Sequence, residues 1–149
     1  MKIVVDTNII FSGILNSTSR IGQLLLTSKK HFQFYTCDFL RQELSRHKIK
    51  LLKLTKLPED DLAELETLIT KNISFINEAL ISPSLLQSAE QLVHDIDPND
   101  TPFVALTEHL NAILWTGDKE LLKGLKAKHF RNIISTQDLY FLYDELESK

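Results

Sequence analysis

Residues 2–11 have the sequence KIVVDTNIIF, in which a β-branched apolar run ends at Asp6 and apolar residues resume at Ile9. Such a run is typical of a strand that is buried in a parallel sheet. Open α/β sheets bind ligands just beyond the carboxyl ends of their strands, which is where this sequence places Asp6. Asp6 could equally cap the helix that follows, because aspartate is a favoured N-cap residue.

The alternation of strands and helices continues along the chain, with no internal repeat, low-complexity segment or linker. Strands are predicted at residues 2–5, 32–35, 73–76, 112–115 and 133–134. Helices are predicted at residues 9–15, 19–25, 36–44, 58–69, 83–93, 101–110, 119–122 and 139–146. This order predicts an α/β fold with three layers, α/β/α, in which about five mostly parallel strands form the sheet. Residues 1–149 are expected to form one domain.

The composition is that of an ordinary globular protein, since 43% of the 149 residues are hydrophobic and 25% are charged. No apolar stretch approaches the roughly 20 residues of a membrane span, and the N-terminus lacks the apolar segment of a signal peptide. A membrane role is therefore not expected. The only cysteine, Cys37, excludes an internal disulfide, so the reducing cytoplasm is the simplest location.

The net charge of −3 hides two basic clusters. Residues 41–56 carry six Lys or Arg against one acid, and residues 119–131 carry five against one. A basic segment beside a carboxylate site suits a polyanionic substrate, although a solvated helix face explains any single run equally well. The predicted phosphate contacts are Lys48, Lys50 and Lys119.

Three further acids are expected near the same edge of the sheet as Asp6. Glu43 lies in the helix after the second strand, Asp100 precedes an apolar helix, and Asp118 follows the fourth strand. Each has an ordinary alternative: Glu43 has the context of a surface helix acid, and the aspartates suit turns and helix caps. Asp97, which shares a proline-bounded turn with Asp100, is assigned to a structural or supporting role.

Converging carboxylates repel one another unless a divalent cation joins them, so Asp6, Glu43, Asp100 and Asp118 predict a metal site. Mg²⁺ prefers such oxygen ligands, and a metal beside a groove predicts chemistry on a phosphate. Zinc is not predicted, because the five histidines lack paired spacing and there is one cysteine. A Gly-x-Ser-x-Gly elbow and a glycine-rich phosphate loop are also absent.

Over roughly residues 2–140, the chain resembles the PIN-domain ribonucleases, especially the small bacterial and archaeal PIN proteins that are toxins of toxin–antitoxin pairs. The matching segments are VVDTN (4–8), EL (43–44), DPNDTPFVAL (97–106) and LWTGDKELL (114–122). Thr107 departs mildly from the family pattern, and residues 46–56 match nothing in it. The resemblance implies that Asp6, Glu43, Asp100 and Asp118 are metal-binding catalytic acids, with Asn8, Thr116 and Asp97 as polar companions.

The resemblance also implies an activity. It is that of a Mg²⁺- or Mn²⁺-dependent endoribonuclease, in which metal-activated water hydrolyses RNA phosphodiester bonds and leaves a 5′-phosphate and a 3′-hydroxyl. An antitoxin protein and a homodimer are further expectations from the family. The residues that could form a dimer surface or simply fill the core are Ile14, Leu15, Leu24, Leu25 and Leu26.

Two alternatives remain open from the sequence. One is a Mg²⁺-dependent phosphohydrolase with Asp6 as nucleophile, but the haloacid-dehalogenase-like version needs a second aspartate where this chain has Asn8. The other is a PIN-fold module that binds RNA or a partner without catalysis. Such modules typically lose some of the four acids, whereas all four candidates are present here.

Overall fold

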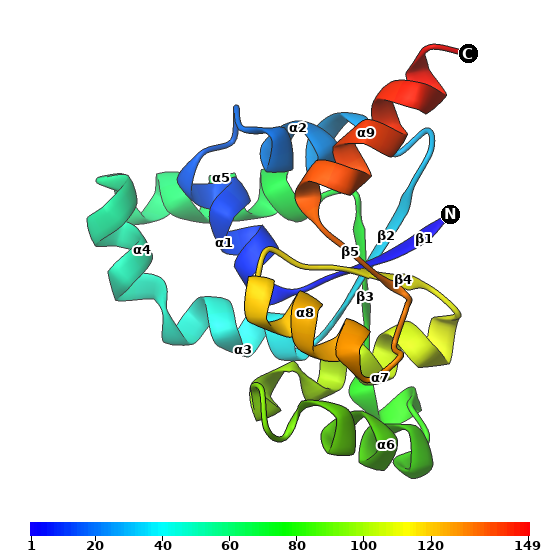
Figure 1. Ribbon diagram of the computed structural model, residues 1–149. Coiled ribbons are helices and arrows are strands. Elements are labelled where there is room, and N and C mark those ends of the chain that lie inside the picture. Colours follow the sequence, from blue (N-terminus) through cyan, green and yellow to red (C-terminus); the bar gives the residue numbers. More distant parts are fainter.

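The buried run Ile3-Val4-Val5 forms β1 (Lys2–Val5), the central strand of a five-stranded sheet in the computed structural model of all 149 residues (Figure 1). The strand order is β3-β2-β1-β4-β5, and all four neighbouring pairs are parallel. This confirms the predicted α/β architecture. The other strands are β2 (Gln33–Cys37), β3 (Ile73–Ile76), β4 (Ile113–Trp115) and β5 (Ile133–Ile134).

Helices cover both faces of the sheet. The α-helices are α1 (Thr7–Leu15), α2 (Arg20–Thr27), α3 (Phe39–Arg46), α4 (Lys48–Thr55), α5 (Glu59–Thr70), α6 (Pro83–Val93), α7 (Thr101–Leu110), α8 (Lys119–Ala127) and α9 (Thr136–Glu147). Two short 3₁₀ turns are η1 (Glu78–Leu80) and η2 (Pro98–Asp100). Helices α1, α2, α5 and α9 lie on one face, and α6, α7 and α8 lie on the other (Figure 1).

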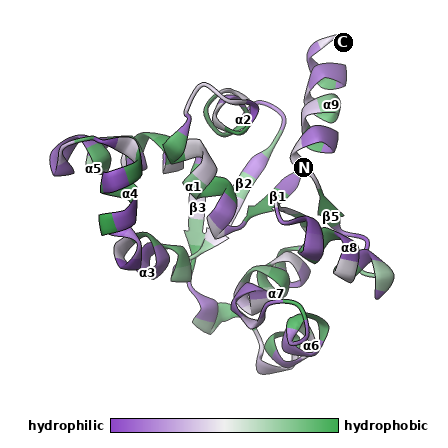
Figure 2. Cartoon of the chain, turned by 60° about the vertical axis from the view of Figure 1, so that its left-hand side comes forward, coloured by the Kyte–Doolittle hydropathy of each residue, from purple (hydrophilic) through white to green (hydrophobic).

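The side chains of β1 alternate between two hydrophobic cores, one on each face of the sheet. Ile3 and Val5 belong to the core beneath α1, α2 and α9, and Val4 belongs to the core beneath α6, α7 and α8. Trp115, at the end of β4, is fully buried. Figure 2 shows hydrophobic colour on β1 and β5 between the helix layers, whereas α3 is mostly hydrophilic.

Strand β2 continues to Cys37, so α3 begins at Phe39 and not at residue 36 as predicted, and two other helices differ more widely from the prediction. Residues 46–56 matched nothing in the family pattern, yet residues Lys48–Thr55 form helix α4. This helix packs against the core through the buried Leu51. Helix α8 was expected to end at Leu122 but continues to Ala127 through Gly124. A Cβ at position 124 would come within 2.5 Å of the Ile96 side chain, so packing explains this glycine inside a helix.

The residues considered for a dimer surface divide between the core and the surface. Ile14, Leu24 and Leu25 are buried in the core and Leu26 is half-buried, whereas Leu15 is exposed. Among the helices, none has the length and apolar character needed to cross a membrane.

Candidate active site

Asp6 directly follows β1. In the strand order β3-β2-β1-β4-β5, the direction in which successive strands are added reverses between β1 and β4. Val5 pairs with Trp115, so Asp6 and Thr116 emerge next to each other at the carboxyl ends of these strands. The Asp6 side chain is 2% exposed, and its Oδ1 accepts a hydrogen bond of 3.0 Å from the N–H of Ile9. The Thr116 hydroxyl also lies close enough to this carboxylate to lower its pKa. Asp6 therefore caps α1 and also occupies the predicted ligand position.

A cavity of about 100 Å³ opens beside Asp6. We call it the acidic cavity, because it brings together three of the four predicted acids: Asp6, Glu43 and Asp100. Its walls come from the end of β1, α1, α3, η2 and the start of α7. The lining residues are Asp6, Thr7, Asn8, Phe11, Glu43, His47, Asp97, Asn99, Asp100 and Phe103.

Asp118 does not line the acidic cavity, but its charge raises the pKa values of both Asp6 and Asp100. Its Oδ1 caps α8 by accepting hydrogen bonds from the N–H groups of Glu120 (2.9 Å) and Leu121 (3.2 Å). Its own N–H donates to Thr116 Oγ1 at 3.0 Å, which ties the fourth acid to the strand beside Asp6.

Glu43 is buried, contrary to the surface position that its helical context suggested. Helix α3 turns it inward together with Leu40 and Leu44, which pack in the core. Its Oε2 lies 3.6 Å from Arg46 Nη1 and 3.8 Å from His47 Nε2. These basic partners were not identified from the sequence, although spacings of three and four residues place them on the same side of a helix.

Burial and mutual repulsion disturb the ionisation of two of the acids. Burial, reinforced by the charge of Asp118, raises the pKa of Asp6 to about 6, although hydrogen bonds from Thr116 and Ile9 oppose the shift. The pKa of Asp100 rises to about 7, first through burial and then through the charges of the other carboxylates. Those carboxylates are Asp6, Asp97, Asp118 and Glu43. The carboxylates are therefore close enough to influence one another's ionisation.

The two aspartates of the η2 turn have different surroundings. Asp97 caps η2, because its Oδ1 accepts a hydrogen bond of 3.0 Å from the N–H of Asn99. Asp100 precedes α7 without any capping bond from its side chain. Both oxygens of the Asp100 carboxylate are thus free of capping bonds, whereas Asp97 uses one of its oxygens for the cap.

The donor set suits a hydrated divalent cation. No group of three or more His, Cys, Asp or Glu side chains is arranged to grip a metal ion directly. Mg²⁺, however, normally keeps several waters and uses only one or two carboxylates. Thr7 Oγ1, on the wall of the acidic cavity, is the one buried side-chain polar atom without a partner. A water held by such an ion would give this hydroxyl a partner and would offset the repulsion among the acids.

Thr7→Val is expected to leave the free energy of unfolding unchanged or to raise it by up to about 1 kcal/mol, since this hydroxyl makes no hydrogen bond that the substitution could remove. Thr36→Val is the matched comparison, because Thr36 Oγ1 donates to the carbonyl oxygen of Val5 at 2.8 Å. That variant should be destabilised by about 1 to 2 kcal/mol. Urea denaturation of the metal-free variants measures both values. Equal destabilisation by the two substitutions would contradict the assignment of Thr7 as unpartnered.

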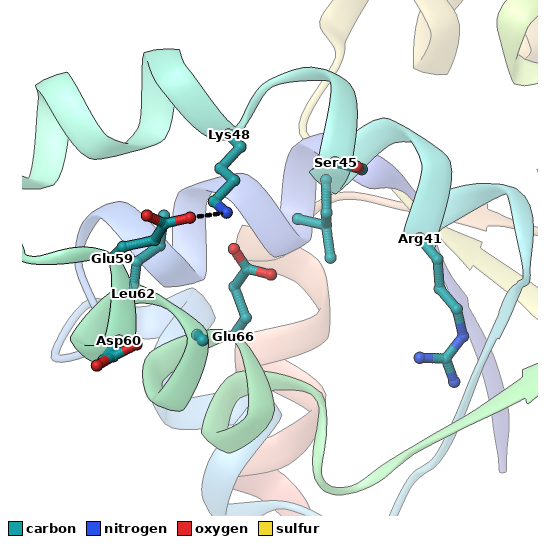
Figure 3. Close-up of a pocket in the computed structure, with 9 residues that line it drawn as sticks. Arg41, Ser45, Lys48, Glu59, Asp60, Leu62 and Glu66 are labelled. Atoms are coloured by element: carbon teal, nitrogen blue, oxygen red, sulfur yellow. Dashed lines mark hydrogen bonds and ion pairs between the residues drawn. The ribbon is translucent and has the colours of Figure 1, made fainter.

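The predicted phosphate contacts lie outside the acidic cavity. Lys50 and Lys119 are exposed on α4 and α8. Lys48 borders a larger cavity of about 470 Å³ between α3, α4 and α5. Figure 3 shows Lys48 reaching Glu59, to which it is hydrogen-bonded, while Glu66 points toward the same gap. The charge of Lys48 is thus already partly neutralised.

Comparisons with known proteins agree with this architecture. A family model described as PIN domain matches residues 4–138, whereas no match is found among curated proteins. A chain in the crystal structure of VapBC2 from Rickettsia felis, bound to a DNA fragment from their promoter, is 16% identical with a TM-score of 0.67. That alignment covers 91% of this chain and 97% of the other. PAE2754 from Pyrobaculum aerophilum is 12% identical with a TM-score of 0.68, over 97% of this chain and 90% of its own. At such identities the two likenesses establish the fold alone.

Proposed function

The chain belongs to the PIN-domain family, and from this premise we propose that it is a Mg²⁺- or Mn²⁺-dependent endoribonuclease. The observation that supports the proposal most strongly is the convergence of acids from four separate segments: burial, and then the charges of the other carboxylates, raise the pKa of Asp100 to about 7. PIN domains are generally nucleases that use divalent metal ions. The preference for RNA and for Mg²⁺ or Mn²⁺ is part of the proposal.

Asp6, Glu43, Asp100 and Asp118 would hold the metal in this proposal. Once bound there, the ion would supply an activated water and offset the charge that develops on the phosphate. Neighbouring groups of the protein hold these carboxylates in position. The N–H of Ile9 orients the Asp6 carboxylate, the Thr116 hydroxyl favours the charged form of Asp6, and the start of α8 orients Asp118. Asn8 and Asp97 lie on the wall of the acidic cavity, where they would orient bound waters.

The two basic neighbours of Glu43 are consistent with metal binding at this site. Arg46 and His47 contact its carboxylate in the absence of metal, so the buried charge is partly compensated before any ion binds. An ion that takes over Glu43 would release these basic side chains toward the RNA phosphates. Without metal, Arg46 and His47 would compensate the charge of Glu43. With metal bound, they would be available to the substrate instead.

The proposal is tested by incubating the wild-type protein with a mixed-sequence single-stranded RNA in Mg²⁺, Mn²⁺ or EDTA. Cleavage with either metal, none in EDTA, and products with 5′-phosphate and 3′-hydroxyl ends are the expected results. Cleavage that persists in EDTA would refute the metal-dependent mechanism. No cleavage of any RNA by folded, metal-loaded protein would favour a PIN-fold module that binds RNA without cutting it.

Alanine substitutions of Lys50 and Lys119 should weaken RNA binding and reduce its salt dependence, by a slope of about one for each phosphate that a lysine no longer neutralises. Lys48→Ala should have a smaller effect, because Lys48 already pairs with Glu59. Lys29→Ala is the control, since Lys29 is exposed beside the amino end of β2, at the opposite edge of the sheet. Filter binding from 50 to 300 mM KCl measures the slopes. Unchanged slopes in the Lys50 and Lys119 variants would remove these residues from the RNA surface.

An antitoxin partner is proposed on the resemblance to toxin PIN proteins and on the structural likeness to VapBC2. Its inhibitory segment is expected to cover the acidic cavity and to offer Arg or Lys to the carboxylates. Co-purification from the native cell tests this, and recovery of the single chain alone would count against it. Homodimerisation and a cytoplasmic location stay predictions.

A further inference from the structure

A second cavity, of about 340 Å³, adjoins the acidic cavity and shares a wall with it. Asn99 lines both cavities. Phe39 lines the second and packs edge-on against Phe103, which lines the first, with ring centroids 6.3 Å apart. A strand of RNA whose phosphate reaches the acidic cavity could therefore place a neighbouring group in the second. The residues that line this second cavity are Phe39, Glu90, Pro98, Asn99, Thr101 and Pro102.

The walls of this cavity suit a flat, uncharged ring. Phe39 provides an aromatic surface, and Pro98 and Pro102 provide apolar rings. No Lys or Arg lines the cavity and Glu90 adds a carboxylate, so a phosphate would be disfavoured there. The volume falls within the range of about 300 to 1,000 Å³ that is usual for small-molecule sites.

Asn99 adds a polar group that could recognise the edge of such a ring. Its backbone N–H is already bonded to Asp97 Oδ1, while its side chain is exposed. An asparagine amide offers both a donor and an acceptor, which is what hydrogen bonding to a base edge requires. The Thr101 hydroxyl, in contrast, is used internally, because it donates to the carbonyl oxygen of Pro98 at 2.7 Å.

The walls are held in place without a ligand. The N–H of Phe39 donates to Glu78 Oε1 at 2.5 Å, which fixes the start of α3 against the η1 turn. The cap on η2 and the hydroxyl bond of Thr101 fix the opposite wall. A preformed site loses little entropy when it binds, so its affinity does not depend on closing a loop.

We propose that this second cavity binds one nucleobase of a single-stranded RNA, next to the phosphate in the acidic cavity. The base stacks on Phe39, and the Asn99 amide hydrogen-bonds to its edge. Only an unstacked base can enter such a cavity, so the substrate class is single-stranded RNA or a loop, and duplex RNA is excluded. This inference rests on the proposed ribonuclease function for the position of the phosphate.

The test uses single-stranded RNA oligonucleotides that carry 2-aminopurine, whose fluorescence falls when it stacks, at each position in turn. With wild-type protein in EDTA, we expect quenching at one position only. Phe39→Ala should weaken binding of that oligonucleotide about 10- to 100-fold, in line with the removal of one stacking platform, and Phe39→Tyr should retain it. Asn99→Ala should bind but change the preferred base. Phe141→Ala, which removes an exposed ring on α9, is the control and should bind as wild type does.

The outcomes separate this inference from the ribonuclease proposal. Quenching that Phe39→Ala abolishes, in a protein that cleaves no RNA, would support the base site and reject the nuclease. Metal-dependent cleavage with no quenched position would do the reverse. Identical binding by folded wild type, Phe39→Ala and Asn99→Ala would also overturn the base site, whatever the cleavage result.

Discussion

Asp6→Asn is expected to abolish RNA cleavage while leaving the fold intact. The decrease in rate should reach at least about 100-fold, because substitution of mere supporting residues around a metal already costs 10- to 100-fold. The fold should survive because asparagine caps helices as well as aspartate does and can still accept the hydrogen bond from Ile9. The measurement is the cleavage rate in Mn²⁺, with circular dichroism to verify folding.

Asp61→Asn is the matched control for this variant. Asp61 is an exposed aspartate in the first turn of α5, and it does not line the acidic cavity. It should cleave RNA at the wild-type rate. Folded Asp6→Asn that cleaves as fast as this control would show that the reaction takes place elsewhere.

Asp100→Asn is expected to make the metal-free protein more stable at pH 8 and no more stable at pH 3.5. Burial and then the repulsion of the other acids raise the pKa of Asp100 to about 7, and both penalties disappear when the carboxylate becomes a neutral amide. The free energy of unfolding should rise by about 1 to 2 kcal/mol at pH 8, after allowance for solvent screening of this half-buried group. Thermal and urea unfolding in EDTA measure the difference.

The direction follows from the folded and unfolded pKa values of the carboxylate. Below pH 3.8, Asp100 is neutral in both states and has little effect on wild-type stability. Above pH 7, it is charged in both states, and only the folded state bears the cost of burying this charge and the repulsion of the other acids. The advantage of the variant should therefore develop between these values. A variant that is less stable than wild type at pH 8 would contradict the electrostatic account.

Adding Mn²⁺ should reverse the order of stability. An ion that binds only the folded state stabilises it by mass action, and wild type should gain more than the variant because it retains the full set of acids. Calorimetric melting with and without Mn²⁺ measures both gains. Asp61→Asn should respond to the metal as wild type does.

Strands and helices that are marked by a short run of neighbouring residues could be predicted from the sequence. The strands before Asp6 and Asp118 could be assigned because a buried parallel strand ends where its run of apolar residues stops. Parallel strands joined by helical crossovers end at the same edge of a sheet, so the convergence of loops there was predictable as well, whereas the strand order β3-β2-β1-β4-β5 was not predicted.

The burial of Glu43 and its two basic partners could not be predicted in the same way. A glutamate inside a helix is ordinarily exposed, and only the tertiary placement of α3 directs it into the acidic cavity. Helix α4 was missed because Lys residues are scattered through it and a single leucine, Leu51, is fully buried. The second cavity depends on Phe39 and Asn99 meeting across 60 positions of sequence, which no local pattern encodes.

The most direct test of the account is a calorimetric titration of Mn²⁺ into the metal-free protein and its variants. Wild type and Asp61→Asn should bind the metal alike, whereas Asp6→Asn, Glu43→Gln, Asp100→Asn and Asp118→Asn should each bind it more weakly. This result would show that acids from four separate segments form one metal site. Equal binding by all six proteins, or no binding by folded wild type, would contradict it.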